Sequence, residues 1–250
     1  MGDRLALYRA LLRHLKALDY RFYTMSHYLD ALSRGNTFVE PVCLLRIDID
    51  SDPGGAARMF EIDREEGVRA TYFFRLSTLD ARLASRIAGY GREVGYHYEE
   101  IATAVRRLGL AHPNEIEAHM DAIRAAFRSN VIHFRERSGI APRVVAAHGD
   151  FLNRRLGTTN RHLLTPALRA ELGIVADAYD PELHDRLAAR FSDRPAPLWW
   201  YPADPMQALA SRPPTVSILV HPRQWVCNPL ENANRAFTRL THEIAWQIRR

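Results

Sequence analysis

Short apolar runs alternate with amphipathic segments along most of this chain. Runs rich in β-branched and aromatic residues, bounded by Gly, Pro, Asp or Asn, predict β-strands. The longer segments between them carry apolar residues three and four positions apart, which predicts helices. The predicted strands are 42–50, 69–76, 93–98, 143–148, 174–179, 197–201 and 215–221, and the predicted helices are 55–66, 79–90, 114–138, 165–172 and about 230–249. This alternation indicates parallel strands joined by right-handed crossovers.

Polar strand ends favour a closed barrel over an open, doubly wound sheet. Five predicted strands end in acidic or imidazole side chains: Asp48 and Asp50, His97, His148, Asp177 or Asp180, and His221. In a parallel barrel these ends converge on one mouth, whereas in an open sheet they spread along an edge. We therefore predict a parallel α/β barrel of seven strands in a single domain, 1–250. Residues 1–38 would form a helical extension of two helices packed outside the barrel at 39–250.

The strand at 42–50 carries the strongest chemical signal. Asp48 and Asp50 lie two residues apart at its end, so both side chains point to the same face. Neighbouring carboxylates are costly unless a cation or a proton lies between them. The pair therefore suggests a metal site or a general base, with an edge strand or a helix cap as the alternative interpretation. Asp52 is expected to cap the helix that follows.

Three histidines at other strand ends could complete such a site. His97 and His148 are candidate ligands, because neutral imidazole combined with carboxylate is a common zinc ligand set. Structural roles are the alternative: a hydrogen-bonded His97 and a His148 that caps the next turn. His221 is placed where a general acid could act, and the nearby Trp225 could wall a sugar-binding cleft or belong to the core.

Charge and length narrow the possible partners. The net charge is +5, and the basic residues are scattered arginines apart from Lys16. Without a basic stripe or a known module, we expect no nucleic-acid partner. Scattered arginines fit an anionic small substrate such as a nucleotide- or phosphate-linked sugar, and a compositional bias toward Arg fits equally well. No apolar run reaches membrane-span length, and the N-terminus lacks a signal-peptide pattern, so we expect a cytoplasmic protein.

In their order, these segments resemble the polysaccharide deacetylase family (NodB-like, carbohydrate esterase family 4). The residues Asp48-Ile49-Asp50 are similar to the family's first motif, a strand ending in two Asp. Segment 67–74 resembles the second strand, G-x-x-A-T-F-F, and segment 93–97 resembles the start of the second motif, E-x-G-x-H. Segment 219–222 is similar to the last motif. The resemblance covers about 42–222.

The resemblance implies an irregular seven-stranded (β/α) barrel that removes N- or O-acetyl groups from sugars with a divalent metal, zinc being the expected ion. It further implies that Asp50 and His97 bind the metal, that Asp48 is the base, and that His221 protonates the leaving group. Divergent members of this kind resemble proteins of O-antigen and surface-polysaccharide synthesis. The substrate would then be an acetylated sugar, free or attached to a nucleotide or a lipid.

Two departures from the family pattern change the expected site. Ile101 stands where the second motif usually has another His, so His148 is expected to supply the missing ligand, with Glu100 as a weaker substitute. The third motif, which corresponds to segment 146–150, lacks its usual Arg. Arg46, on the same strand face as Asp48, is expected to orient that base.

Two other functions stay open at this point. Ile101 favours a non-catalytic sugar-binding or scaffold protein that kept the fold. A different barrel hydrolase, such as a phosphodiesterase or an amidohydrolase, would need more metal ligands, usually a two-metal set. It would also need a phosphate-binding loop, which the sequence does not show.

Overall fold

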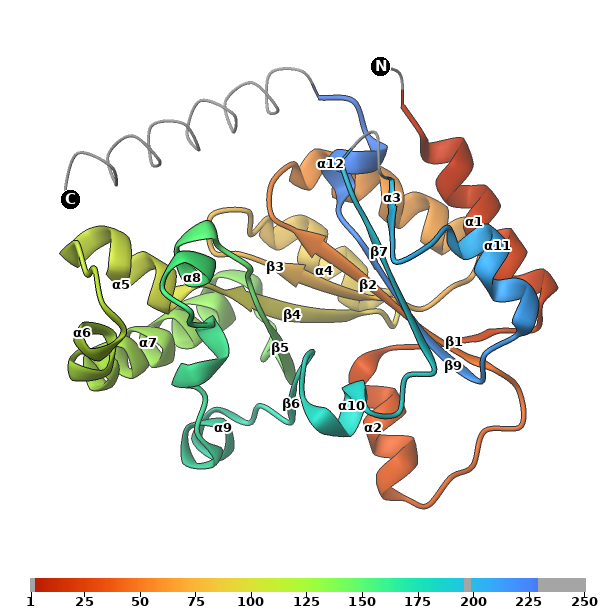
Figure 1. Ribbon diagram of the computed structural model, residues 1–250. Coiled ribbons are helices and arrows are strands. Elements are labelled where there is room, and N and C mark those ends of the chain that lie inside the picture. Colours follow the sequence, from red (N-terminus) through yellow and green to blue (C-terminus); the bar gives the residue numbers. More distant parts are fainter. Residues whose placement is uncertain (1–2, 196–198, 229–250) are drawn as a thin grey trace.

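A single curled sheet forms the centre of the molecule (Figure 1). The computed structural model describes residues 3–195 and 199–228, so the predicted helix at 230–249 lies outside the described residues. The sheet order is β6-β5-β4-β3-β2-β9-β7-β8, and β1 pairs with β2. The strands are β1 (Arg21–Tyr23), β2 (Val42–Ile49), β3 (Thr71–Phe74), β4 (Glu93–Tyr98), β5 (Val144–Ala147), β6 (Ala176–Asp177), β7 (Ala189–Asp193), β8 (Trp200–Tyr201) and β9 (Thr215–Val220).

The parallel α/β architecture predicted from the sequence is confirmed, in the form of a half-barrel. Among the described strands every pairing is parallel except that of β7 with β8, which is antiparallel. The hydrogen-bonded path ends at β6 and β8. Each of the seven predicted strands contains an observed one, and β1 and β7 were not predicted.

Alternate residues of β2 face two different cores, because side chains alternate across a strand. Cys43, Leu45 and Ile47 belong to the large apolar cluster that includes the surrounding helices. Val42 and Leu44 belong to a smaller cluster with residues of β3, β5 and β6. Residues 46 and 48 share the parity of this second set, so their polar side chains enter the concave side of the sheet.

Helices surround the sheet (Figure 1). They are α1 (Leu5–Ala17), α2 (Met25–Ser33), α3 (Pro53–Glu65), α4 (Ala81–Gly89), α5 (Glu100–Leu108), α6 (Pro113–Ala118), α7 (Met120–Ser138), α8 (Phe151–Arg155), α9 (Pro166–Leu172), α10 (Pro181–His184), α11 (Pro205–Ala208) and α12 (Pro222–Trp225). The predicted helix at 114–138 is two helices that meet at His119. Among the described residues, none of these helices has the length and apolar character needed to cross a membrane.

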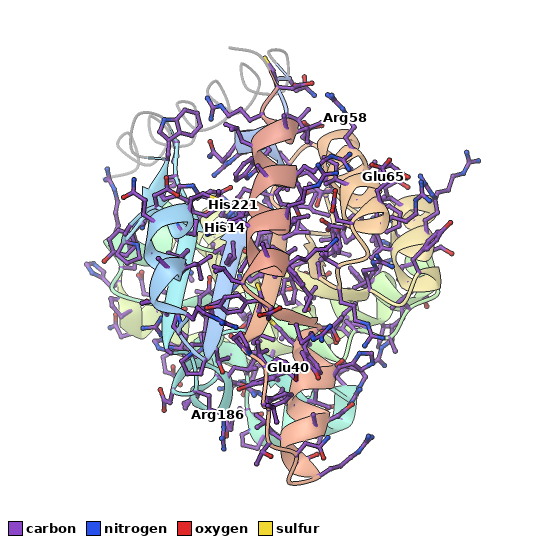
Figure 2. The ribbon with its side chains drawn as sticks, turned by 90° about the vertical axis from the view of Figure 1, so that its right-hand side faces the viewer. His14, Glu40, Arg58, Glu65, Arg186 and His221 are labelled. Carbon is purple, nitrogen blue, oxygen red and sulfur yellow. The ribbon has the colours of Figure 1, made fainter. Side chains whose placement is uncertain are left out.

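The N-terminal segment contains two helices with β1 between them, and β1 pairs with β2, so part of this segment joins the sheet and does not pack outside it. Figure 2 looks onto α1, which lies between α11 and α3 and contacts both. Its buried face is Tyr8, Leu11, Leu12 and Leu15, spaced for one stripe of a helix. The Tyr8 hydroxyl donates to the buried carboxylate of Asp63 on α3 at 2.6 Å, so the extension is tied directly to the barrel.

Candidate active site

The carboxyl ends of β2, β4, β5 and β9 converge, and they bring five of the predicted site residues together. Asp48 lies on β2 and Asp50 follows its last residue. His97 lies on β4, whereas His148 and His221 directly follow β5 and β9. The register pairs His97 with Ala146 of β5, and the backbone N–H of His148 donates to the carbonyl of Tyr98 at 2.8 Å. Parallel pairing therefore sets the positions of these side chains.

Asp50, His97 and His148 form a cluster that could hold a metal ion. One ligand atom from each of the three lies within 4.8 Å of the others. Nε2 of His97 is 3.2 Å from Oδ1 of Asp50, and Nε2 of His148 is 3.5 Å from the same oxygen. The side chains of Asp50 and His97 are almost completely buried. Two imidazoles and one carboxylate are a ligand set typical of a catalytic zinc site, which leaves a further position for water or substrate.

The hydrogen bond on the far side of His97 determines what its Nε2 can do. Nδ1 of His97 is 2.9 Å from the carbonyl oxygen of Ala146. A carbonyl can only accept, so Nδ1 carries a proton, and in the neutral ring Nε2 is a bare lone pair. That lone pair faces Oδ1 of Asp50 at 3.2 Å and Oδ2 of Asp48 at 3.4 Å. Acceptors facing acceptors at this distance require a cation or a second proton between them.

Oδ1 of Asp50 likewise lacks a hydrogen-bond donor among the described residues. This oxygen is buried, whereas buried polar atoms in proteins are nearly always paired. Burial raises the pKa of Asp50, but the positive charge of the neighbouring histidines in their protonated form outweighs burial and holds it well below its usual value. The carboxylate of Asp50 is therefore ionised and can bind a cation. The donor set fits a divalent metal, with Asp50, His97 and His148 as the ligands.

A second cluster behind His148 is already neutralised by arginine. Glu99, His148 and Asp150 also lie close enough together to bind an ion. However, Nη2 of Arg75 lies 2.5 Å from Oε1 of Glu99, and Nη1 of Arg106 lies 2.5 Å from Oδ2 of Asp150. We therefore interpret this cluster as an ion-pair network that supports the site.

Glu99 is the member of this network that lies behind a candidate ligand, and the sequence analysis missed it. Its Oε2 is 3.4 Å from Nδ1 of His148, which places a carboxylate behind that imidazole, as often occurs behind metal-binding histidines. Burial raises the pKa of Glu99, but His148 and Arg75 lower it to about 2. Its position directly after β4 was the available signal.

Arg46 holds Asp48 with two hydrogen bonds inside the barrel. Its Nε and Nη2 each donate to a different carboxylate oxygen of Asp48 at 2.7 Å. The guanidinium also packs on Phe73 and Tyr179, 5.2 and 4.5 Å from the ring centroids. Burial raises the pKa of Asp48, but the charge of Arg46 outweighs it, and the net pKa lies below the usual value. Asp48 is therefore an ionised carboxylate held in one orientation by Arg46, in place of an Arg from segment 146–150.

His221 is held by Asp193, a residue that the sequence analysis missed because β7 was not predicted. Nδ1 of His221 donates to Oδ1 of Asp193 at 2.6 Å, and the backbone N–H of His221 donates to Oδ2 at 2.7 Å. Burial lowers the pKa of His221, but the charge of Asp193 outweighs burial and raises it. Nε2 of His221 lies 4.0 Å from Oδ2 of Asp50, so the proton-bearing ring stands at the edge of the metal cluster.

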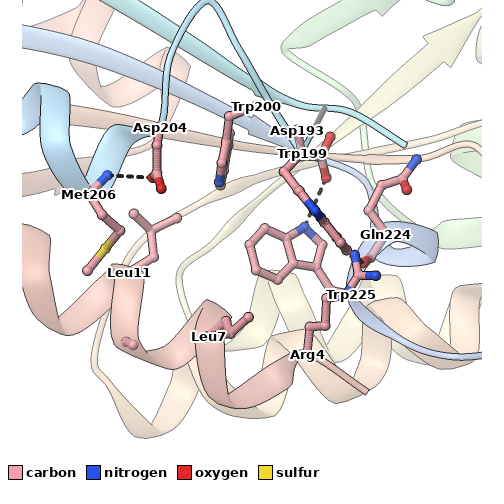
Figure 3. Close-up of a pocket in the computed structure, with 11 residues that line it drawn as sticks. Arg4, Leu7, Leu11, Asp193, Trp199, Trp200, Asp204, Met206, Gln224 and Trp225 are labelled. Carbon is pink, nitrogen blue, oxygen red and sulfur yellow. Dashed lines mark hydrogen bonds between the residues drawn. The ribbon is translucent and has the colours of Figure 1, made fainter. Parts of the chain in front are cut away.

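A pocket adjoins Asp193 and contains Trp225 in its wall (Figure 3). Its volume is about 310 Å³. Apolar side chains from α1, α11, α12 and residues 199–200 line it: Leu7, Leu11, Trp199, Trp200, Met206 and Trp225. The Trp225 indole donates to Asp193 at 2.9 Å and is buried. Trp225 therefore belongs to the core and also braces the carboxylate that holds His221.

Other sequence candidates lie away from the cluster. Ile101 is fully buried in the large apolar core, on α5. Glu100 accepts from Tyr96 at 2.6 Å and from Asn130 at 2.9 Å, so it is engaged elsewhere and does not replace a ligand.

Asp177 and Asp180 form their own group at the end of β6. Asp177 accepts from the Tyr98 hydroxyl at 2.8 Å, and Asp180 pairs with Arg169. Asp177 also accepts from the backbone N–H of Tyr179, and Asp180 accepts from that of Asp177; among the described residues, neither carboxylate pairs with a residue of the metal cluster. Asp52 caps α3 by accepting from Gly55 at 2.9 Å.

Comparisons with known proteins give no sequence match: no protein-family model and no curated protein matches this chain. Solved structures that it resembles include family 4 carbohydrate esterases and deacetylases. A family 4 pseudoenzyme from Bacillus anthracis shares 16% identity with a TM-score of 0.43, covering 82% of this chain and 62% of its own. This chain thus spans less than two thirds of that structure.

Two further solved structures cover more of their own length. The Streptococcus pyogenes deacetylase PplD, in complex with acetate, shares 12% identity with a TM-score of 0.48, covering 88% of this chain and 84% of its own. A family 4 acetyl xylan esterase from Clostridium thermocellum, in complex with a cobalt ion, shares 18% identity with a TM-score of 0.42, covering 76% and 78%.

Proposed function

We propose that this chain is a metal-dependent hydrolase that removes an acetyl group from an N- or O-acetylated sugar. One observation carries the proposal. The Nε2 atoms of His97 and His148 both lie beside Oδ1 of Asp50, at 3.2 and 3.5 Å, and that oxygen is buried with no hydrogen-bond partner among the described residues. A buried acceptor facing two imidazole nitrogens is best satisfied by a cation.

Asp50, His97 and His148 would hold the metal ion, and we expect zinc because two imidazoles and a carboxylate suit it. Bound there, the ion would supply Lewis-acid polarisation of the acetyl carbonyl and a lowered pKa of water. Ala146 keeps Nδ1 of His97 protonated, so Nε2 is the ligating atom. Glu99 lies behind Nδ1 of His148 and favours the same arrangement for that ring.

Asp48 and His221 would carry the two proton transfers. Asp48 is ionised and fixed by Arg46, so it can accept the proton of the attacking water. His221 carries a raised pKa and is oriented by Asp193, so it can give a proton to the departing amine or hydroxyl. Each transfer contributes roughly 10²–10⁴-fold to the rate. Arg46 and Asp193 act as positioning residues for these two groups.

The wider assignment follows the motif resemblance. We propose a cytoplasmic enzyme of surface-polysaccharide synthesis, similar to those of O-antigen pathways, made of one barrel domain with an N-terminal helical extension. Its substrate would be an acetylated sugar, free or linked to a nucleotide or a lipid. These points rest on segments 48–50, 67–74, 93–97 and 219–222.

The test is the metal content of the purified protein and of two His variants by elemental analysis. We expect about one metal per chain in the wild type and a loss of it in His148→Ala. His133→Ala is the matched control, because His133 is exposed on α7 and should leave the metal in place. Absence of metal in the wild type, even after zinc is added, would favour the non-catalytic barrel instead.

A further inference from the structure

Arginines at the mouth of the half-barrel differ in how far their hydrogen-bonding capacity is used. Arg46, Arg75 and Arg106 each donate close hydrogen bonds to a carboxylate. Arg223 does not: its closest described ion partner is Oδ2 of Asp50, 3.6 Å from Nη2. This distance exceeds that of a hydrogen bond. Nε of Arg223 is buried and has no partner among the described residues.

The backbone places Arg223 beside the reacting groups. It is the second residue of α12, directly after His221 and Pro222. The turn is closed by the backbone N–H of Gln224, which donates to the carbonyl of His221 at 2.9 Å. The Arg223 side chain keeps 28% of its surface exposed, so the guanidinium is partly open to a ligand entering the site.

Metal binding at Asp50 would leave the charge of Arg223 unbalanced. The carboxylate of Asp50 faces the guanidinium across 3.6 Å. A divalent cation on the same carboxylate adds two positive charges where one negative charge stands. Because charges interact strongly in a partly desolvated site, the loaded site attracts an anion. A guanidinium with unused donors matches the two oxygens of a phosphate or a carboxylate.

We propose that Arg223 forms an anion subsite that binds an oxyanion group, a phosphate or a carboxylate, on the acetylated sugar. This inference rests on the proposed function, and it defines the substrate class as anionic acetylated sugars. Arg223 selects them by offering guanidinium donors next to the cluster of Asp50, His97 and His148. A neutral acetylated sugar leaves those donors unpaired, which carries a cost for a buried donor.

A purely structural ion pair explains these contacts less well. Arg46 shows what a structural pair looks like in this site, with two bonds of 2.7 Å to Asp48 and no exposed donor to spare. The guanidinium of Arg223 makes no such bond to Asp50 among the described residues. With its nearest described carboxylate oxygen at 3.6 Å and its Nε without a partner among the described residues, the guanidinium keeps hydrogen-bonding capacity for a ligand.

The experiment measures binding of three sugars to zinc-loaded protein by calorimetry, in an Asp48→Asn background so that the sugar is not consumed. N-acetylglucosamine 1-phosphate carries a phosphate, N-acetylmuramic acid carries a carboxylate, and N-acetylglucosamine is neutral. We expect Arg223→Gln to weaken binding of at least one anionic sugar tenfold or more and to leave the neutral sugar unchanged. Arg223→Lys should retain part of the preference. Arg186→Gln is the control, because Arg186 is exposed.

The two anionic sugars separate phosphate from carboxylate recognition. Zinc affinity gives a readout independent of sugar binding: Arg223→Gln should bind zinc as tightly as the parent or more tightly, since a cation beside Asp50 is removed. Equal affinity for all three sugars in the parent, or an equal loss for neutral and anionic sugars in Arg223→Gln, overturns the anion subsite. A parent protein that holds no zinc overturns the proposed function itself, and the subsite with it.

Discussion

Arg46 and Asp48 form a two-bond ion pair from within one strand, with Nε and Nη2 of the arginine each 2.7 Å from a carboxylate oxygen. Residues two apart on a strand lie on the same face, so a single strand supplies both members of the pair. Both side chains are nearly fully buried. Because a buried charge needs a partner, each residue makes the other tolerable, and Asp48 is kept ionised in a fixed orientation.

Replacing Arg46 by Met should lower kcat/KM by roughly 10²-fold or more, because Asp48 loses its orienting partner and general-base catalysis is worth that much. Metal content should be unchanged, since Arg46 does not contact Asp50, His97 or His148 through any described hydrogen bond. Deacetylation of an acetylated sugar and elemental analysis of the same sample give the two readings. Unchanged turnover would remove Arg46 from the mechanism.

The same variant should also lose stability, by about 3–5 kcal/mol, because it leaves a buried carboxylate without a partner. Combining Arg46→Met with Asp48→Asn removes that charge and should recover much of the loss in urea unfolding. Activity should stay low in the double variant. Asp48→Asn removes the base in any case, so the double variant tests stability alone: recovery there would show that the loss in Arg46→Met comes from the unpaired carboxylate of Asp48.

Replacing Asp48 and replacing His97 should have different effects on metal content, although both should abolish turnover. Asp48→Asn should abolish turnover and keep the metal, because the amide cannot accept the proton of water at neutral pH. His97→Ala should lose both metal and turnover, since Nε2 of His97 is 3.2 Å from Asp50. Parallel assays and elemental analysis of both variants check this. An active Asp48→Asn would show that the base is another residue.

The sequence was sufficient for those site residues that stand at the ends of well-formed strands. Asp48, Asp50, His97, His148 and His221 follow buried apolar runs, so the strand pattern alone predicts that they converge. The face shared by Arg46 and Asp48 was predictable for the same reason. Their roles in metal binding and catalysis stay predictions, which the variants above are designed to test.

Residues that hold the predicted ones were harder to find. Asp193 lies on β7, a strand of five residues with several partly exposed positions, where the apolar alternation is weak. Glu99 follows β4 directly, yet its role depends on the distance to His148 across the site. A single sequence shows local periodicity but not which long-range side chains meet. Supporting residues are therefore visible only in three dimensions.

Asp193→Asn should move the alkaline limb of the activity profile to lower pH. The charge of Asp193 raises the pKa of His221 above its ordinary value. A general acid works only while it is protonated, so lowering its pKa makes activity disappear at a lower pH. The profile of kcat/KM against pH measures the shift. Asp204→Asn is the control, because Asp204 caps α11 through Met206 and lines the opposite part of the pocket (Figure 3); a shift of equal size there would contradict the assignment.

Asp63 offers a test of the fold that is independent of the active site. It is fully buried, and it accepts hydrogen bonds from the Tyr8 hydroxyl of α1 and the Tyr72 hydroxyl of β3. Burial raises the pKa of Asp63 to about 7, against the opposing effect of these two hydrogen bonds. An unfolded Asp has a pKa near 3.9, so the folded state holds this proton more tightly.

The sign of the resulting pH dependence follows from linkage. The stabilisation from a raised acid pKa is complete below about pH 4 and is lost as pH rises through about 7. Asn resembles the protonated acid, so Asp63→Asn should gain stability relative to the wild type by about 2–3 kcal/mol between pH 5 and pH 8. Urea unfolding of both proteins at the two pH values measures the difference. Asp121→Asn, at an exposed carboxylate of α7, should show no such change; a constant difference between Asp63→Asn and wild type across this range would mean that Asp63 stays ionised in the core.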